Sequence, residues 1–199
     1  MVDAPLINPL VLFFASIMTS NILLSNFLGM CSFIAISKDW KSSMGLGIAV
    51  TLVIGICAAV CWTVLYFVII PLDIEYLSFI IFIIVIAAVV QMLEMIIDRV
   101  SPALYLALGI FLPLITVNCA VLGVILFMQI RRYDFVQSVL FGLGSGAGWW
   151  LAIMLLAAIR KKVDAAPVPA GLKGTGITLI TIGFIAMAFM GFSGMISVQ

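Results

Sequence analysis

The chain has 199 residues, of which 66% are hydrophobic and only 9% are charged. A soluble domain of this length could not bury so much apolar surface, so the composition excludes an ordinary soluble protein and predicts an integral membrane protein. The net charge is +1 and the sequence contains no histidine. This excludes histidine-ligated haem, zinc sites of the usual type and catalytic Ser-His or Cys-His pairs formed within this chain.

The long uncharged stretches are predicted to be transmembrane α-helices. In lipid, backbone N–H and C=O groups must be paired within the segment or in a closed barrel, and the sequence lacks the alternating pattern of barrel strands. Six spans fit, at residues 8–37, 43–70, 77–97, 102–130, 135–159 and 174–197. They leave no soluble domain, so residues 1–199 are expected to form a single all-α membrane domain.

The first and fourth spans are predicted to be broken into half-helices. The uncharged stretch between Asp3 and Lys38 would be about 50 Å long as one straight helix, against about 30 Å of hydrocarbon. Breaks of this kind in both halves of a membrane protein are typical of a buried site. The interrupting residues precede a cysteine in each case: Ser20, Asn21, Ser25, Asn26 and Gly29 before Cys31, and Pro113, Thr116 and Asn118 before Cys119.

Cys31 and Cys119 are therefore candidate ligands of an iron–sulfur cluster. Such a cluster needs thiolates, and the N–H groups and partial positive charge at a broken helix compensate a thiolate in lipid. From the residues alone, the alternative is that both are small buried hydrophobic residues. Two thiolates cannot complete a four-thiolate cluster, so either Cys57 and Cys61 join them or a second chain contributes two more.

Cys57 and Cys61 lie one helical turn apart on the second span. They lack the polar, broken-helix surroundings of the other two cysteines, and a Cys-x-x-x-Cys pattern on a continuous helix is a weak signal. We interpret them as core packing residues.

The two halves also form a weak internal repeat, at about residues 1–100 and 101–199. Each half holds three helices, and an odd number requires the second copy to be inverted in the membrane. Seven of the nine Lys and Arg residues fall in the segments 38–42, 98–101 and 160–173. The positive-inside rule places these segments in the cytoplasm and both termini on the outer side.

Glu94 is a charged residue inside the third span. The helical spacing places Gln91 and Asp98 on the same face. An intramembrane carboxylate is a candidate for a cation or proton path. The alternative is an interfacial acid paired with Arg99 or with a lysine of a neighbouring chain.

Glycines recur at every second position of the fifth span. They form two overlapping Gly-x-x-x-Gly pairs, which are typical of close helix packing. The residues are Gly142, Gly144, Gly146 and Gly148.

Five stretches carry a resemblance to a known family: Leu28–Cys31, Gln91–Arg99, Leu108–Ala120, Gly144–Trp149 and Gly191–Gly194. In them the chain resembles the E subunits of the sodium-translocating NADH:ubiquinone oxidoreductases, and also the sister family, the A subunits of the Rnf ferredoxin:NAD oxidoreductases. The resemblance covers essentially the whole chain. The Pro-Leu-Ile-Thr-x-Asn-Cys stretch at 113–119 is specific to these two families, and the motifs at 93–99 and 144–149 favour the sodium-pump family.

The resemblance implies a six-helix inverted-repeat subunit in the bacterial inner membrane. It implies pairing with a homologous membrane subunit, which is the D subunit in the sodium pump and the E subunit in the Rnf complex. Two cysteines from each chain would hold one 2Fe-2S cluster, and the matching residues here are Cys31 and Cys119. The cluster would relay electrons from the cytoplasmic NADH-oxidising subunit to an outer-side FMN, and Glu94 falls in the motif associated with entry of the transported Na⁺. The competing function classes are a transporter without a redox cofactor and a scaffold subunit.

Overall fold

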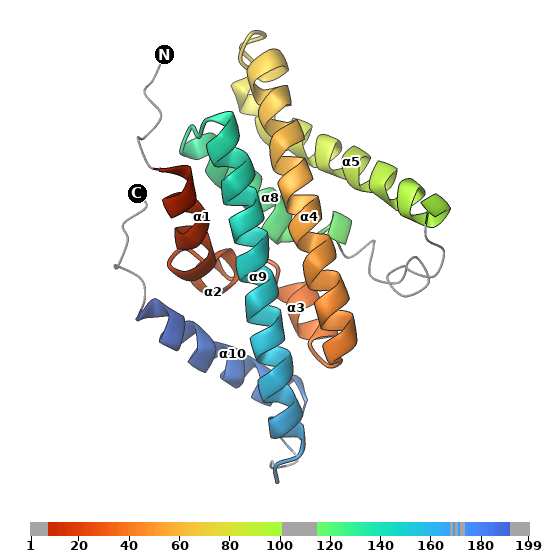
Figure 1. Ribbon diagram of the computed structural model, residues 1–199, viewed down its shortest axis with the longest axis vertical. Coiled ribbons are helices and arrows are strands. Elements are labelled where there is room, and N and C mark those ends of the chain that lie inside the picture. The colour runs from red at the N-terminus through yellow and green to blue at the C-terminus, as the bar shows by residue number, and fades with distance from the viewer. Residues whose placement is uncertain (1–7, 101–114, 168, 170, 172–173, 192–199) are drawn as a thin grey trace.

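The computed structural model describes residues 8–100, 115–167, 169, 171 and 174–191, and its regular elements are helices (Figure 1). Three stretches are long and apolar enough to cross a membrane, at Trp40–Ile69, Glu75–Ile96 and Phe135–Val163. They correspond to the second, third and fifth predicted spans, which confirms an all-helical membrane protein. The α-helices are α1 (Pro9–Met18), α2 (Ile22–Asn26), α3 (Met30–Ile36), α4 (Trp40–Val64), α5 (Ser78–Val100), α8 (Cys119–Ile130), α9 (Phe135–Asp164) and α10 (Thr175–Met190).

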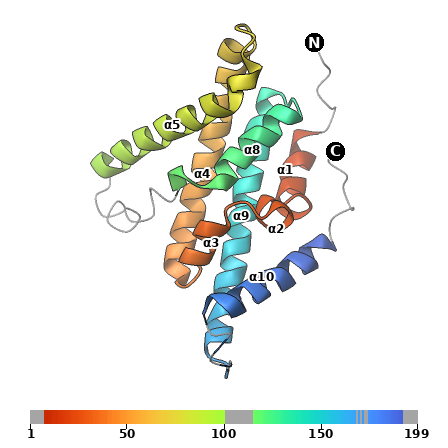
Figure 2. The same ribbon diagram turned by 180° about the vertical axis from the view of Figure 1, so that it is seen from behind.

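Helices α4 and α9 run in opposite directions side by side through the centre of the molecule (Figures 1 and 2). Two glycines of α9 allow the backbones to approach closely. A Cβ atom at Gly142 would lie 2.9 Å from the Cβ of Ala58, and one at Gly146 would lie 2.7 Å from the Cα of Thr51. The predicted close packing is confirmed for this glycine pair.

The other two glycines of α9 face a different helix. A Cβ atom at Gly144 would clash with the hydroxyl of Ser16, and one at Gly148 would lie 3.1 Å from the carbonyl oxygen of Ile17. Both contacts are with α1. The two overlapping pairs therefore pack against two separate helices, α4 on one side of α9 and α1 on the other.

The predicted first span, at 8–37, is three short helices. A polar residue stabilises its first break: Asn21 is fully buried, and its Oδ1 accepts a hydrogen bond from the amide of Leu23 at 3.1 Å. Its Nδ2 donates to the carbonyls of Ile17 at 3.1 Å and Gly148 at 2.8 Å. The side chain thus pairs backbone groups at the break and ties the break to α9. Such side-chain bonds are how broken helices are tolerated in membranes.

Helix α9 extends to Asp164, beyond the predicted end of the fifth span at residue 159. Arg160, which the charge pattern places in a cytoplasmic loop, is instead a buried residue of α9. Its Nη1 donates hydrogen bonds to the carbonyl of Ile34 at 3.1 Å and to the hydroxyl of Ser37 at 2.9 Å. The cation therefore satisfies the C-terminal end of α3, where a positive charge is favourable.

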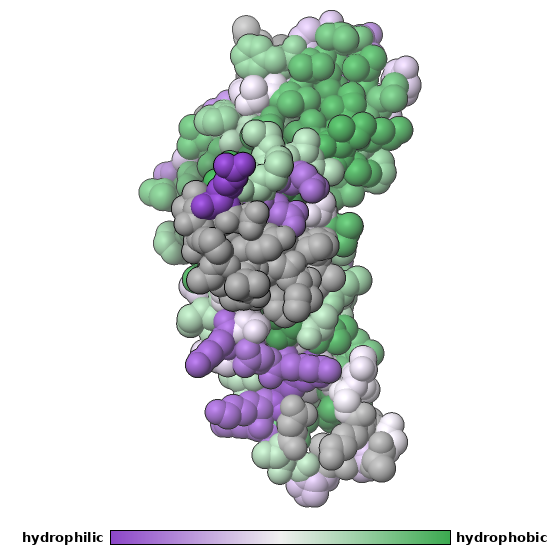
Figure 3. All heavy atoms as spheres, turned by 90° about the vertical axis from the view of Figure 1, so that its right-hand side faces the viewer, coloured by the Kyte–Doolittle hydropathy of each residue, from purple (hydrophilic) through white to green (hydrophobic). Residues whose placement is uncertain are grey.

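Basic residues gather at one end of the molecule. Lys38 and Lys41 flank the start of α4, and Lys161 and Lys162 lie on the last turn of α9; both ends are at the bottom of Figure 1. The start of α4 is fixed by Asp39, whose carboxylate accepts hydrogen bonds from the amide and hydroxyl of Ser42, and these bonds hold the pKa of that carboxyl below its usual value. Seen from the side of α5, hydrophobic residues cover the upper part and hydrophilic residues gather lower down (Figure 3).

Candidate functional site

Both candidate cysteines lie in the first turn of a helix that follows a break. Cys31 is the second residue of α3 and Cys119 is the first residue of α8. Both are exposed on the surface of the chain. Their helices begin after Gly29 and Asn118, respectively, so both cysteines lie in the turn whose backbone N–H groups have no partner within the helix.

The structure brings the two breaks together. The backbone amide of Gly29 donates a hydrogen bond to the Sγ of Cys119 at 2.9 Å, although the two residues are 90 positions apart. A second bond joins the same segments, from the Nδ2 of Asn118 to the hydroxyl of Ser32 at 3.2 Å. The hydroxyl of Ser32 in turn donates to the carbonyl of Gly29 at 3.1 Å. The residues before Cys31 and those around Cys119 therefore form one connected polar site.

Gly29 has a backbone conformation that favours glycine, with φ at +87°. A Cβ atom there would lie 2.6 Å from the Nε1 of Trp149, 3.0 Å from the Oδ1 of Asn118 and 3.1 Å from the Cβ of Ala120. The absence of a side chain thus allows α8 and α9 to approach the break before Cys31. Glycine at this position is a geometric requirement of the site.

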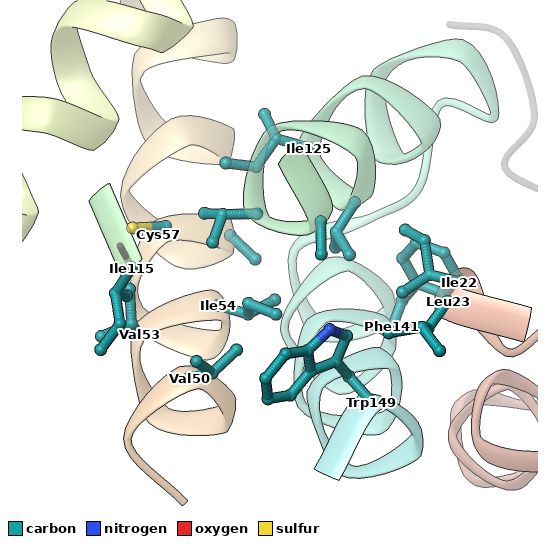
Figure 4. Packing of buried hydrophobic residues seen from close by; sticks show 14 of the residues in the cluster. Ile22, Leu23, Val50, Val53, Ile54, Cys57, Ile115, Ile125, Phe141 and Trp149 are labelled. Carbon is teal, nitrogen blue, oxygen red and sulfur yellow. The ribbon is translucent and has the colours of Figure 1, made fainter. Parts of the chain in front are cut away.

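Trp149 is the neighbour that sequence reasoning missed. Its ring is fully buried in the hydrophobic core (Figure 4), and its indole N–H has no hydrogen-bond partner within the described part of the chain. It belongs to the Gly-Ser-Gly-x-Gly-Trp motif at 144–149. This motif predicts helix packing and carries part of the family resemblance, and neither predicts a contact of the Trp149 ring. The motif thus contains Trp149, but the sequence pattern alone does not indicate which segment the ring contacts.

Cys57 and Cys61 differ from Cys31 and Cys119 in their burial. Both have no exposed surface, and they pack in the same hydrophobic cluster as Ile115 and Ile125 (Figure 4). Among the described residues, no group of three or more His, Cys, Asp or Glu side chains could hold a metal ion. The structure therefore does not assemble the four cysteines of this chain into one site.

The donor set fits half of an iron–sulfur site. Two exposed thiols stand at neighbouring helix breaks, and one of them already accepts an N–H bond of the type that stabilises a cluster sulfur. The described part of the chain offers two thiols here, whereas a four-thiolate cluster needs two more.

Glu94 lies on α5 and is partly buried. Within the described residues, no ion pair joins Glu94 to Arg99. The alternative that Glu94 is an interfacial acid paired with Arg99 therefore gains no support from this chain. The side chain of Asp98, which the helical spacing places on the face of Glu94, lies outside the described residues. Pro113 of the fourth span also lies outside them.

The fold and the site define a polytopic helical membrane protein whose two halves meet at paired helix breaks. A family model described as Rnf-Nqr subunit, membrane protein, matches residues 10–196. Among curated relatives, the chain is 52% identical over 193 residues to the E subunit of the Na⁺-translocating NADH-quinone reductase of Psychromonas ingrahamii, a match that covers 92% of this chain and 96% of the relative.

Two further relatives carry the same description. The E subunit of Pasteurella multocida is 53% identical over 189 residues, with 92% of this chain and 96% of the relative covered. The E subunit of Chlamydia trachomatis serovar L2 is 50% identical over 204 residues, with 96% of this chain and 84% of the relative covered. The chain therefore belongs to the Rnf-Nqr family of membrane subunits, in the group of the sodium-pump E subunits, as the sequence motifs predicted.

Proposed function

We propose that the chain is the E subunit of a bacterial Na⁺-translocating NADH-quinone reductase and that it supplies Cys31 and Cys119 to a shared 2Fe-2S cluster. The observation that carries this proposal is the contact between the two breaks, in which the Gly29 amide donates to the Cys119 sulfur at 2.9 Å. Redox use explains two surface thiols in an apolar protein better than packing does, because packing cysteines are buried, as Cys57 and Cys61 are.

The partner in this proposal is the homologous membrane subunit, the D subunit of the pump, which supplies the other two thiolates. Both cysteines lie on the surface of the chain, where a facing chain can approach them. A cluster held there would carry single electrons from the NADH-oxidising subunit on the cytoplasmic side to a covalent FMN on the outer side. In this chain, the Gly29 amide and the first turn of α8 would stabilise the negative charge of the Cys119 thiolate.

The finer fold in this proposal is a six-span inverted repeat with both termini on the outer side of the inner membrane. Its support is the arrangement of helices in Figure 1. Helix α5 leaves the top of α4 and slopes downward on one side, whereas α10 leaves the bottom of α9 and slopes upward on the other. Such opposed courses are expected of two halves related by an axis in the membrane plane.

Glu94 is proposed to guide the transported Na⁺. It is a partly buried carboxylate on an apolar helix, and it has no ion pair within the described residues. A carboxylate in such a position is costly unless a cation approaches it.

The test of the redox role compares two double variants of the intact complex. Cys31→Ala with Cys119→Ala should remove the iron and acid-labile sulfide of one 2Fe-2S cluster and stop electron flow from NADH to quinone. The NADH-oxidising subunit should still reduce artificial acceptors. The matched control, Cys57→Ala with Cys61→Ala, should keep both the cluster and the activity. Full iron content and quinone reduction in the first variant would exclude the redox role and favour a transporter or scaffold.

A further inference from the structure

A second polar site lies away from the cysteines, between the first helix break and the end of α8. It is a pocket of about 210 Å³. The lining combines hydroxyl and amide groups from the α1–α2 segment with one cation and two phenyl rings. The residues are Thr19, Ser20, Ile22, Ser25, Asn26, Phe127, Arg131 and Phe141.

Among the described residues that line the pocket, Arg131 is the only charged one. Its Nη1 donates to the hydroxyl of Tyr133 at 3.0 Å, and its guanidinium carbon lies 5.7 Å from the ring centre of Phe127 and 5.9 Å from that of Phe141. In the part of the chain that the structure describes, no carboxylate forms an ion pair with it. The rings and the neutral hydroxyl therefore hold the guanidinium in place without neutralising it.

A partly buried guanidinium without a counter-charge is costly, and the two rings recover only part of that cost. Arginine presents five N–H donors in a planar fork that matches the oxygens of a phosphate or carboxylate. The hydroxyls and the amide of the same lining are further donors for the oxygens of such a group. The pocket thus has both the charge and the donors that an oxyanion requires.

We infer that this pocket binds a phosphate group, presented by a phospholipid headgroup or as free phosphate. Arg131 holds the charge, and the hydroxyls of Ser20 and Ser25 orient the oxygens. Met18 and Phe27 flank the pocket residues in the sequence and expose apolar side chains, which suits acyl chains beside a bound headgroup. None of the cysteines is in the pocket lining.

The test uses the purified complex and two neighbouring arginines. Arg131→Gln removes the pocket cation, whereas Arg132→Gln removes an equal charge from the adjacent exposed residue. Native mass spectrometry counts the phospholipids that each complex retains from nanodiscs of phosphatidylglycerol or phosphatidylcholine. We expect Arg131→Gln to weaken retention by about tenfold or more, because it loses a charge-assisted contact, and Arg132→Gln to leave retention unchanged.

A second probe separates the two sources of phosphate. Inorganic phosphate is added to the delipidated complex, and its binding is measured by calorimetry. Selective loss of lipid retention in Arg131→Gln identifies a headgroup, and selective loss of phosphate binding identifies a free anion; either supports the pocket. Ser25→Leu, which fills the pocket and keeps the cation, should show the same loss. Unchanged binding of both probes in Arg131→Gln, or equal losses in Arg132→Gln, would overturn the proposal. The iron content of each variant shows that the complex is intact.

Discussion

Gly29→Ala is expected to remove the cluster without touching a cysteine. The substitution has two costs. Alanine in the left-handed region costs about 1–2 kcal/mol, and the new Cβ would lie 2.6 Å from the Nε1 of Trp149 and 3.0 Å from the Oδ1 of Asn118. Forcing an extra methyl group into a packed site costs about 1–3 kcal/mol more. The sum, about 2–5 kcal/mol, exceeds the strength of the Gly29 to Cys119 bond, which is about 1 kcal/mol.

The expected structural result is that the start of α8 moves away from the break before Cys31. The measurement is iron and sulfide per complex, together with the electron paramagnetic resonance signal of the reduced cluster. Gly174→Ala is the matched control, because Gly174 also has a positive φ, at +100°, but a Cβ atom there would meet no atom of the described residues within 4 Å. Strain alone would affect both variants, whereas crowding of the site affects only Gly29→Ala. A Gly29→Ala complex with full iron content would refute the reasoning.

Other parts of the molecule give three further predictions. Gly146→Ala should destabilise the chain by about 1–2 kcal/mol in an SDS unfolding titration, since overpacking against Thr51 outweighs the better helix propensity of alanine. Gly183→Ala should be neutral or stabilising, because a Cβ atom at Gly183 would meet no atom of the described residues within 4 Å. Glu94→Gln should raise the Na⁺ concentration needed for half-maximal turnover and leave the iron content intact. The control is Glu75→Gln, at an exposed residue. The same shift in Glu75→Gln, or no shift in either variant, would favour the alternative that Glu94 is an interfacial acid. A reporter fused after residue 199 should be active only outside the cytoplasm, and cytoplasmic activity would reverse the orientation.

Local signals predicted much of the fold. Apolar stretches of sufficient length marked the second, third and fifth spans, because each such helix satisfies its own backbone in lipid. Polar punctuation marked the broken first span, because Asn21 can pair freed backbone groups only where a helix stops. These features depend on neighbours in the sequence, so the sequence is enough to predict them.

The same local signals could not predict contacts between segments that are distant in the sequence. The Gly29 to Cys119 bond and the ring of Trp149 behind Gly29 depend on how three helices meet. Arg160 shows the same limit: counting basic residues near a span end placed it in a loop, whereas its burial against the end of α3 follows from the position of that short helix. Charge counts indicate which side a residue is near and do not indicate what its side chain binds.

The central claim, that Cys31 and Cys119 are cluster ligands, is tested most directly by thiol labelling of the intact complex. A membrane-permeant maleimide is applied before and after the cluster is destroyed by oxidation and iron chelation, and each cysteine is followed by mass spectrometry. Cys31 and Cys119 should be protected at first and become labelled together once iron is lost, in a complex that keeps all its subunits. Cys57 and Cys61, which have no exposed surface, should stay unlabelled throughout. Labelling of Cys31 or Cys119 while the cluster is intact would contradict the account.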